Sequence, residues 1–479
     1  MDKHINLIPF PHSIIEREGF FESNNYKNHI KNNTDSSILA EGYRLEIGPT
    51  NIKISASDNA GFFYAQQTLK QLETEKNDTN TDKTVRFPNC IIEDSPAYSW
   101  RGFMIDCSRS FYPASWLEKI IDVAAFYKLN RFHWHLTDDQ GWRLPIPEYP
   151  LLTEIGAWKY DRRFTDRTTK IGGYTCSRAY YTEKEIRHLV AYAAERHITV
   201  VPEIEMPGHV SALLAAYPGL GCTGGPYKVE DRYGIFDNVL CAGNDDVLKL
   251  YETIFDRVCN LFPGDWIHIG GDECPHTAWK SCNKCKKRIQ DEGLQSVDQL
   301  QPWLTVKIAS MLEKRRKIPI GWDEVLDGTQ NMPLPKSMTV QSWRGIEGGK
   351  KAAALGHFVI MSPQYDGCYF DFKNYDDEYE PGGRATNTVY NSYNFSPVTQ
   401  ELTPREAKYV LGGQGNLWTE IIPSPKLAEY MLFPRLCALS EALWLSVDKK
   451  NFKSFSTSLT VHKKRLRSMD ILYYDGKLE

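Results

Sequence analysis

Long apolar runs are lacking in this sequence of 479 residues. No window approaches the roughly 18 consecutive apolar residues that a membrane-spanning helix requires. The first residues, Met1 to Asn6, contain no apolar segment of the kind found in a signal peptide. A large excess of one charge is lacking too, because 57 Lys and Arg stand against 61 Asp and Glu. We therefore expect neither a membrane span nor a nucleic-acid partner.

The eleven cysteines are scattered and lack the dense spacing of a small disulfide-rich protein. Their odd number leaves at least one thiol free or paired outside the chain. Cys222 and Cys241 bracket a glycine-rich loop and could staple it. Cys282 and Cys285 form a CxxC, but a single CxxC without a second ligand pair is a poor zinc site. A structural disulfide or two free thiols is the interpretation we favour for this pair.

The first 96 residues have a pattern of their own. Residues 43–47 and 52–55 alternate apolar and polar side chains, which predicts half-buried antiparallel strands. Residues 59–72 carry apolar side chains at helical spacing. Clustered His, Cys or carboxylate residues do not occur here, so we predict a small, non-catalytic α+β domain over residues 1–96.

From residue 97 to 479, short apolar runs alternate with longer helical segments. Eight predicted strands lie at residues 103–105, 131–136, 199–204, 266–269, 318–321, 339–341, 358–361 and 410–413. Eight β-then-α units predict an α/β fold, a (β/α)8 TIM barrel. The alternative, a doubly wound open sheet, is disfavoured because no glycine-rich phosphate fingerprint follows the first strand.

Charged and aromatic residues follow nearly every predicted strand. In barrel order these are Arg109; Asp138 and Asp139; Glu205 and His209; Asp272 and Glu273; Trp322, Asp323 and Glu324; Trp343 and Arg344; Tyr369 and Asp371; Trp418 and Glu420. In a TIM barrel they converge on the C-terminal rim, where active sites form. A purely structural barrel has no reason to carry them on one rim.

These residue types favour one chemistry. Serine catalysis is unsupported, since the sequence has no Gly-x-Ser-x-Gly elbow. His133 and His135, on one predicted strand, are interpreted as buried, hydrogen-bonded structural residues. With no convincing metal spacing, we expect no metal and no cofactor. Carboxylates in a cleft lined by Trp and Tyr indicate glycoside hydrolysis. Adjacent Asp272 and Glu273 would point in different directions, and their like charges would raise one pKa.

Several long motifs then resemble one family, the β-N-acetylhexosaminidases of glycoside hydrolase family 20. The matching stretches are residues 101–109 (RGFMIDCSR), 130–143 (NRFHWHLTDDQGWR), 202–209 (PEIEMPGH), 268–273 (HIGGDE) and 414–420 (QGNLWTE). They occur in the family's order, and the N-terminal unit resembles the family's small non-catalytic domain. The resemblance covers nearly the whole chain.

The resemblance implies an exo-acting, retaining enzyme that removes terminal, non-reducing β-linked GlcNAc or GalNAc. Its substrate's acetamide oxygen is the nucleophile, and an oxazolinium ion is the intermediate. Glu273 matches the general acid/base, and Asp272 matches the residue that holds the acetamide N–H. An intramolecular nucleophile that is already in place removes much of the entropic barrier.

The resemblance also assigns the residues that surround the sugar. Arg109 matches a residue that grips the hydroxyls at carbons three and four, and Asp138 and His209 match supports of the catalytic carboxylates. The remaining matches are Trp322, Trp343 and Trp418 around the acetamide and sugar face, Tyr369 at the acetamide oxygen, and Asp371 and Glu420 at the hydroxyls of carbons six and four. The spacing of residues 361–371 departs from the family pattern, so Tyr365 competes with Tyr369.

Two alternatives stay open. The same chemistry could serve a specialised substrate, as in a disaccharide-releasing lacto-N-biosidase or a 6-sulfo-GlcNAc-specific enzyme. A non-catalytic glycan-binding protein is disfavoured because Asp272, Glu273 and Arg109 are all present. The loop 381–397 could cover the site or bridge subunits, so a homodimer is one option. Glycan scavenging favours a periplasmic or extracellular location, with a cytoplasmic one as the alternative.

Overall fold

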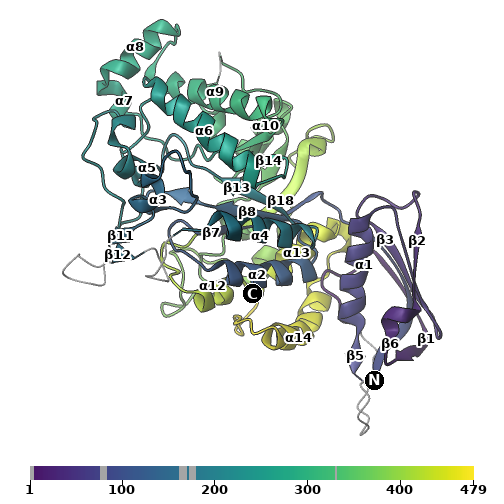
Figure 1. Ribbon diagram of the computed structural model, residues 1–479. Helices are drawn as coiled ribbons and strands as arrows, with labels where there is room; N and C mark the ends of the chain where they lie inside the picture. Colours follow the sequence, from purple (N-terminus) through teal and green to yellow (C-terminus); the bar gives the residue numbers. More distant parts are fainter. Residues whose placement is uncertain (1–4, 76–83, 161–169, 172–179, 330–331) are drawn as a thin grey trace.

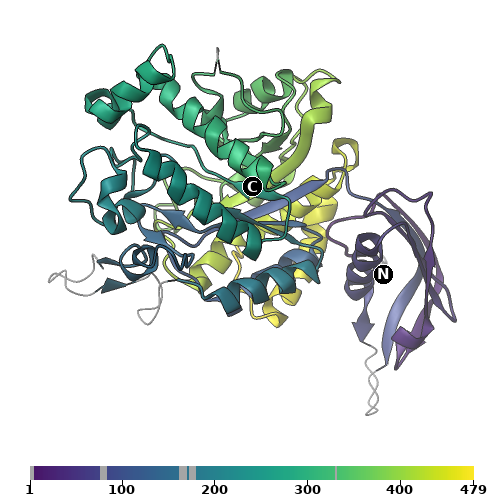
Figure 2. The ribbon, with the colours of Figure 1, turned by 45° about the horizontal axis from the view of Figure 1, so that its top comes forward.

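The computed structural model describes residues 5–75, 84–160, 170–171, 180–329 and 332–479 (Figure 1). Residues 1–4, part of the stretch inspected for a signal peptide, lie outside these ranges. A small sheet-and-helix unit at the N-terminus packs beside a closed barrel surrounded by helices (Figures 1 and 2). Within the described ranges, every helix is too short or too polar to cross a bilayer.

The N-terminal unit is a mixed sheet with one helix. Its strands are β1 (Ser13–Ser23), β2 (Ile30–Thr34), β3 (Tyr43–Ile47), β4 (Ile52–Ala56), β5 (Thr74–Glu75) and β6 (Val85–Asp94). Their order is β1-β6-β3-β4-β2, with β5 also paired to β6. Helix α1 (Asn59–Leu72) starts at Asp58, whose side chain accepts a hydrogen bond from the Gly61 amide. The predicted strands at 43–47 and 52–55, their antiparallel pairing and the helix at 59–72 are confirmed.

Helix α1 lies between this sheet and the barrel (Figures 1 and 2). Buried ion pairs fix the contact: Lys128 Nζ lies 3.0 Å from Asp94 Oδ2, and Arg101 Nη1 lies 2.8 Å from Glu41 Oε2. Arg101 belongs to the start of a barrel strand, so the small unit packs at the end opposite to the strand C-termini. Losing one partner of such a buried pair would be strongly destabilising.

The barrel consists of eight parallel strands in the closed order β13-β14-β15-β16-β17-β18-β7-β8. The strands are β7 (Trp100–Asp106), β8 (Arg131–His135), β13 (Thr199–Glu203), β14 (Trp266–His268), β15 (Ile318–Trp322), β16 (Thr339–Ser342), β17 (Val359–Met361) and β18 (Val410–Leu417). All eight predicted strands and the (β/α)8 TIM barrel are confirmed.

Helices cover the outside of the barrel or lie in the loops at its rim. They are α2 (Ala114–Phe126), α3 (Leu151–Glu154), α4 (Glu183–Ala194), α5 (Ser211–Ala216), α6 (Asp245–Leu261), α7 (Thr277–Ser281), α8 (Asn283–Asp291), α9 (Leu300–Lys314), α10 (Glu347–Ala354), α11 (Val389–Asn394), α12 (Pro425–Leu432), α13 (Arg435–Trp444) and α14 (Phe452–Ser468). Helix α6 shows why they pack there: Val247, Leu250, Ile254 and Val258 recur at helical spacing and are all buried.

Short elements follow the strands on the rim that carries the cavity. The hairpin β9 (Thr137–Asp138) and β10 (Gly141–Trp142) comes after β8, and the 3-10 helix η4 (Asp323–Leu326) comes after β15. Between β15 and β16, η4 stands in place of an α-helix in the described residues 323–329 and 332–338. A second hairpin, β11 (Lys159–Tyr160) with β12 (Lys170–Ile171), lies further out.

Candidate active site

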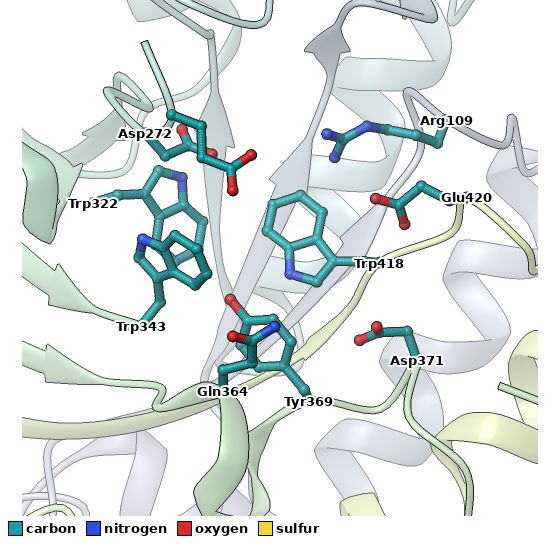
Figure 3. A pocket seen from close by; sticks show the side chains of 10 residues that line it. Arg109, Asp272, Trp322, Trp343, Gln364, Tyr369, Asp371, Trp418 and Glu420 are labelled. Carbon is teal, nitrogen blue, oxygen red and sulfur yellow. The ribbon is translucent and has the colours of Figure 1, made fainter. Parts of the chain in front are cut away.

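A cavity opens at the C-terminal ends of the barrel strands (Figure 3). Ten residues line it: Arg109, Asp272, Glu273, Trp322, Trp343, Gln364, Tyr369, Asp371, Trp418 and Glu420. The structure thus brings together nine of the eleven site residues that the sequence predicts. The cavity volume of about 160 Å³ is below the ~300–1,000 Å³ of pockets for drug-sized ligands. It suits one sugar ring better than a longer glycan segment.

The turn after β14 presents Asp272 and Glu273. Gly270 and Gly271 have φ angles of 65° and 102°, in the left-handed region that favours glycine. A Cβ on Gly270 would also lie 1.7 Å from Glu205 Oε2, so a side chain here would force the buried Glu205 carboxyl group to move. Glu273 has a φ of 45°, an uncommon conformation for a residue with a side chain. The tight turn directs the two acids differently: the Asp272 side chain is 12% exposed and that of Glu273 34%.

His209 lies behind the two acids rather than in the cavity wall. Its Nε2 atom is 3.5 Å from Asp272 Oδ2 and 3.5 Å from Glu273 Oε2. Its Nδ1 atom is 3.0 Å from Asp139 Oδ2 and 3.3 Å from Asp138 Oδ1. Burial lowers the pKa of His209, but the surrounding carboxylates outweigh burial and raise it well above its ordinary value. The ring is therefore an imidazolium cation between two pairs of acids.

Asp272 has a raised pKa. Burial raises the pKa from 3.8 to about 6, opposed by His209 and assisted by Glu203 and Glu273. Its Oδ1 atom is buried and accepts no hydrogen bond from the described residues. Burial is thus the main cause of the raised pKa of Asp272, and the adjacent charge of Glu273 contributes less.

Arg109 and Asp138 form a buried ion pair beside the cavity. Arg109 Nη2 lies 2.8 Å from Asp138 Oδ2, and its Nε donates to Gln140 Oε1 at 3.0 Å. Burial raises the pKa of Asp138, but Arg109 and His209 outweigh it and lower that pKa. Asp138, like His209, is outside the residues that line the cavity. Both side chains thus lie behind the residues that line the cavity.

Four aromatic side chains form one part of the wall. Trp322 donates its indole N–H to Glu203 Oε1 at 2.8 Å, and its ring centroid is 5.8 Å from that of Trp418. Trp343 and Tyr369 are stacked with centroids 6.5 Å apart. Tyr365 is 72% exposed and lies outside the cavity, whereas Tyr369 is 4% exposed and lines it. The geometry favours Tyr369 over its competitor.

The cavity has two chemically different sides. Asp272, Trp322 and Trp343 lie on one side, and Arg109, Glu420 and Asp371 lie on the other (Figure 3). Burial and Glu420 raise the pKa of Asp371, and burial also raises the pKa of Glu420. Asp371 Oδ1 is buried and accepts no hydrogen bond within the described chain. These acids are available to accept hydroxyl donors of a ligand.

Sequence reasoning missed one polar side chain that lines the cavity, Gln364, and one contact beside the cavity, made by Glu324. Gln364 lines it from the loop after β17, and no signal in the sequence distinguishes this residue. Glu324 accepts from the Trp343 indole N–H at 2.9 and 3.1 Å. Burial and the charge of Asp272 raise the pKa of Glu324 to about 9. Glu324 follows a predicted strand, but the sequence did not reveal that it holds Trp343.

A histidine cage around Glu203 lies deeper in the barrel. Glu203 Oε2 is 3.0 Å from His133 Nε2 and contacts His135 Nδ1, and Glu203 Oε1 is 2.8 Å from His268 Nδ1. The prediction that His133 and His135 are buried and hydrogen-bonded is confirmed. These groups come close enough to share a cation. However, the Glu203 oxygens and the three imidazoles already satisfy one another through these short polar contacts.

Comparisons with known proteins agree with the fold. A family model described as "Glycosyl hydrolase family 20, catalytic domain" matches residues 98–447, and "Glycosyl hydrolase family 20, domain 2" matches residues 21–95. A beta-hexosaminidase of Porphyromonas gingivalis is 40% identical over 453 residues, covering 93% of this chain. The chain spans only 56% of that relative's length. A beta-hexosaminidase of Akkermansia muciniphila is 33% identical, with 89% of this chain and 84% of the relative covered.

Solved structures are similar over nearly the whole chain. A GH20 exo beta-N-acetylglucosaminidase from Vibrio harveyi, in complex with N-acetylglucosamine, superposes with a TM-score of 0.88 at 28% identity. The match covers 98% of this chain and 78% of that one. A beta-N-acetylhexosaminidase from Bacteroides fragilis superposes with a TM-score of 0.84 at 29% identity, with 99% of both chains covered.

The TIM barrel with an acid-rich, aromatic-lined cavity at its strand C-termini defines the class, which is that of the glycoside hydrolases. Both family models cover consecutive parts of the chain, and the relatives named above are similar over most of it. This chain belongs to glycoside hydrolase family 20.

Proposed function

We propose that the protein is an exo-acting, retaining β-N-acetylhexosaminidase that removes terminal β-linked GlcNAc or GalNAc by substrate-assisted catalysis. The arrangement of Asp272 carries the proposal. Its buried Oδ1 lacks a hydrogen-bond donor within the described residues, and it lies on the same side of the cavity as Trp322 and Trp343. An acetamide group fits this surrounding, because its N–H can donate to the carboxylate while its methyl group packs on the indole rings.

In the first step, the acetamide carbonyl oxygen attacks the anomeric carbon and the glycosidic C–O bond breaks. Glu273, in its acid form, donates its proton to the leaving oxygen. Positive charge then develops on the acetamide as the oxazolinium ion forms. The carboxylate of Asp272 stabilises this charge and holds the N–H, so that the carbonyl oxygen faces the anomeric carbon. His209, 3.5 Å away, keeps Asp272 in place.

In the second step, the Glu273 carboxylate removes a proton from water. The water oxygen attacks the anomeric carbon, and the bond between that carbon and the acetamide oxygen breaks. Glu273 regains its proton, and the acetamide returns to its neutral form. Two displacements on opposite faces give a product with retained configuration.

The opposite side of the cavity supports exo action. Arg109, Asp371 and Glu420 offer a donor and two acceptors to the hydroxyls of a terminal sugar. The cavity volume of about 160 Å³ suits a single terminal ring. Family relatives named for β-hexosaminidase activity are consistent with this substrate class.

Two properties of the whole protein remain proposals of ours. We propose a periplasmic or extracellular location, because terminal amino sugars on larger glycans are the substrates that the site suits.

We also propose that residues 1–96 and 97–479 form separate domains, since β6 ends at Asp94 and β7 begins at Trp100.

Isosteric variants test the assignment. Glu273→Gln should lower kcat/KM for a β-N-acetylglucosaminide with a poor leaving group by about 10²–10⁴-fold. The loss should shrink for a dinitrophenyl leaving group, which needs little protonation. Glu118→Gln, a half-buried acid on the outer helix α2, serves as a control and should be unchanged. Full activity of Glu273→Gln, or rapid cleavage of a β-glucoside without the acetamide, would contradict the proposal.

A further inference from the structure

Four cysteines that are far apart in the sequence meet beside the active-site loops. Cys222 and Cys241 are at the two ends of one loop, and Cys282 and Cys285 lie at the start of α8. Their sulfur atoms all lie within 4.8 Å of one another. The second ligand pair that the CxxC lacks in the sequence is therefore supplied in space. It is supplied because Gly221 pairs with Leu240, which brings the two loop ends together.

The sulfur–sulfur distances are those of a metal site. They are 3.8 Å for Cys222–Cys285 and 3.7 Å for both Cys241–Cys282 and Cys241–Cys285. A tetrahedron of thiolates around zinc, with Zn–S bonds of about 2.3 Å, has edges of about 3.8 Å. A disulfide needs sulfurs about 2.0 Å apart in a defined pair. In this cluster Cys241 is equally close to two sulfurs, so no pairing is selected.

The surroundings also favour thiolates. Cys282 is the N-cap residue of α8 and Cys285 lies in its first turn, where the helix dipole stabilises negative charge. The same helix carries Lys284, Lys286 and Lys287, whose charges offset the net negative charge of a tetrathiolate zinc site. The Gly243 amide hydrogen-bonds to the thiols of Cys241 and Cys285.

Gly243 is required by the packing of this cluster. A Cβ at this position would lie 2.2 Å from the carbonyl carbon and oxygen of Lys284 and 2.4 Å from the Cys285 amide nitrogen. Any side chain would push the segment around Cys241 away from α8 and separate the two ligand pairs. The close approach of the two backbone segments at Gly243 thus keeps the four sulfurs together.

We propose that Cys222, Cys241, Cys282 and Cys285 bind one structural zinc ion. Four protein ligands leave no coordination position for substrate or water, so the ion has no part in the chemistry of the cavity. Its role is to fasten the loop after β13 to the loop after β14. This inference is independent of the proposed hydrolytic function.

One fastened loop supplies residues of the cavity wall, and the other supports the wall indirectly. The loop from Cys222 to Cys241 supports the Arg109 side: the Arg232 carbonyl accepts from Gln140 Nε2 at 2.8 Å, and Gln140 Oε1 accepts from Arg109 Nε at 3.0 Å. The other loop carries Asp272 and Glu273 and runs through α7 to Cys282. Trp279 of α7 donates its indole N–H to Leu240 O at 2.8 Å, which joins the loops beside the metal site.

The metal content of the whole chain tests the proposal. Protein purified with reductant and without added chelator should contain about one zinc per chain by elemental analysis. A thiol-specific mercurial should release that zinc to a chromogenic chelator. Cobalt-loaded protein should show the thiolate-to-cobalt charge-transfer and d–d bands of a tetrahedral tetrathiolate. Because these three measurements use the unmodified sequence, they remain decisive if a cysteine variant fails to fold.

Matched variants locate the ion. Cys222→Ser and Cys285→Ser should lose zinc stoichiometry and the cobalt spectrum, and amide exchange across residues 221–240 should accelerate. Cys259→Ser, a half-buried cysteine of α6 outside the cluster, should keep both. Zinc-free protein with four reduced thiols, iron in place of zinc, or two disulfides among these cysteines in reductant-purified protein would each overturn the proposal.

Discussion

His209 Nε2 lies 3.5 Å from Asp272 Oδ2, so a buried imidazolium stands directly behind the acid that faces the cavity. The cation opposes, but does not cancel, the effect of burial and of neighbouring carboxylates on Asp272, whose pKa is about 6. The acid is therefore held near the point where it changes charge. Because the charge of Asp272 changes near pH 6, both the catalytic rate and the free energy of unfolding should depend on pH in this range.

The first prediction concerns the acid limb of the pH profile. Asp272 must be ionised to stabilise the positive oxazolinium, so kcat/KM should fall about tenfold per pH unit below its pKa of about 6. Asp272→Asn should lower kcat/KM by about 10²–10³-fold, comparable to the loss of one electrostatic contact to a transition state. Its residual activity should lack the limb near pH 6. An unchanged limb in the variant would assign the titration to another group.

The second prediction is that the same variant stabilises the fold at neutral pH. The raised pKa means that folded protein binds the Asp272 proton more tightly than unfolded protein does. This stabilisation is fully present below pH 3.8 and is lost as pH rises to about 6. Asn has no such charge, so Asp272→Asn should gain up to about 3 kcal/mol near pH 7.5. Urea unfolding at pH 7.5 and pH 4 checks this, and an equal gain at both would contradict it.

The third prediction concerns Glu324, whose pKa of about 9 keeps it protonated at neutral pH. Glu324→Gln resembles the neutral acid in shape and can still accept the Trp343 indole N–H, so kcat/KM should change by less than about twofold. Glu324→Ala leaves that donor unpaired, which costs about 1–3 kcal/mol, and should reduce kcat/KM roughly tenfold. Equal impairment of both variants would mean that a negative charge at Glu324 is needed.

The fourth prediction separates the two tyrosines that compete at the sequence level. The Tyr369 hydroxyl is buried at the cavity, so Tyr369→Phe should lower kcat/KM by several-fold or more, about 1 kcal/mol for one hydrogen bond. Tyr365→Phe removes the same atom from a side chain that is 72% exposed and should have no effect. Steady-state kinetics on one aryl β-N-acetylglucosaminide decide between them. The reverse pattern would move the acetamide contact to Tyr365.

Much of the fold follows from the sequence because each barrel strand is a short apolar run between helical segments. Residues 199–204 and 266–269 are examples, and both coincide with strands that begin where predicted. In the N-terminal unit, β1 was not predicted, because most of its residues are exposed and its pattern does not alternate. Strand β6 contains Pro88, which disfavours a strand assignment from sequence.

Site residues could be predicted where a side chain of suitable chemistry follows a barrel strand. Asp272 and Trp322 follow strands directly, so barrel geometry alone brings them to the rim. Gln364, and the contact of Glu324 with Trp343, could not be found in this way, because the sequence does not fix the direction of a side chain in an irregular segment. The four-cysteine cluster was not predicted for another reason. Cys241 and Cys282 are 41 residues apart, and only the folded loops bring them together.

The nucleophilic role of the substrate's acetamide is the central claim, and fluorination of that group tests it most directly. Aryl glucosaminides with acetyl, monofluoroacetyl, difluoroacetyl and trifluoroacetyl groups differ little in size but progressively weaken the carbonyl oxygen as a nucleophile. The account predicts that log kcat/KM for the unmodified protein falls steeply and steadily along this series. A rate independent of fluorination would show that the acetamide oxygen does not attack the anomeric carbon, and would contradict the roles given to Asp272 and Glu273.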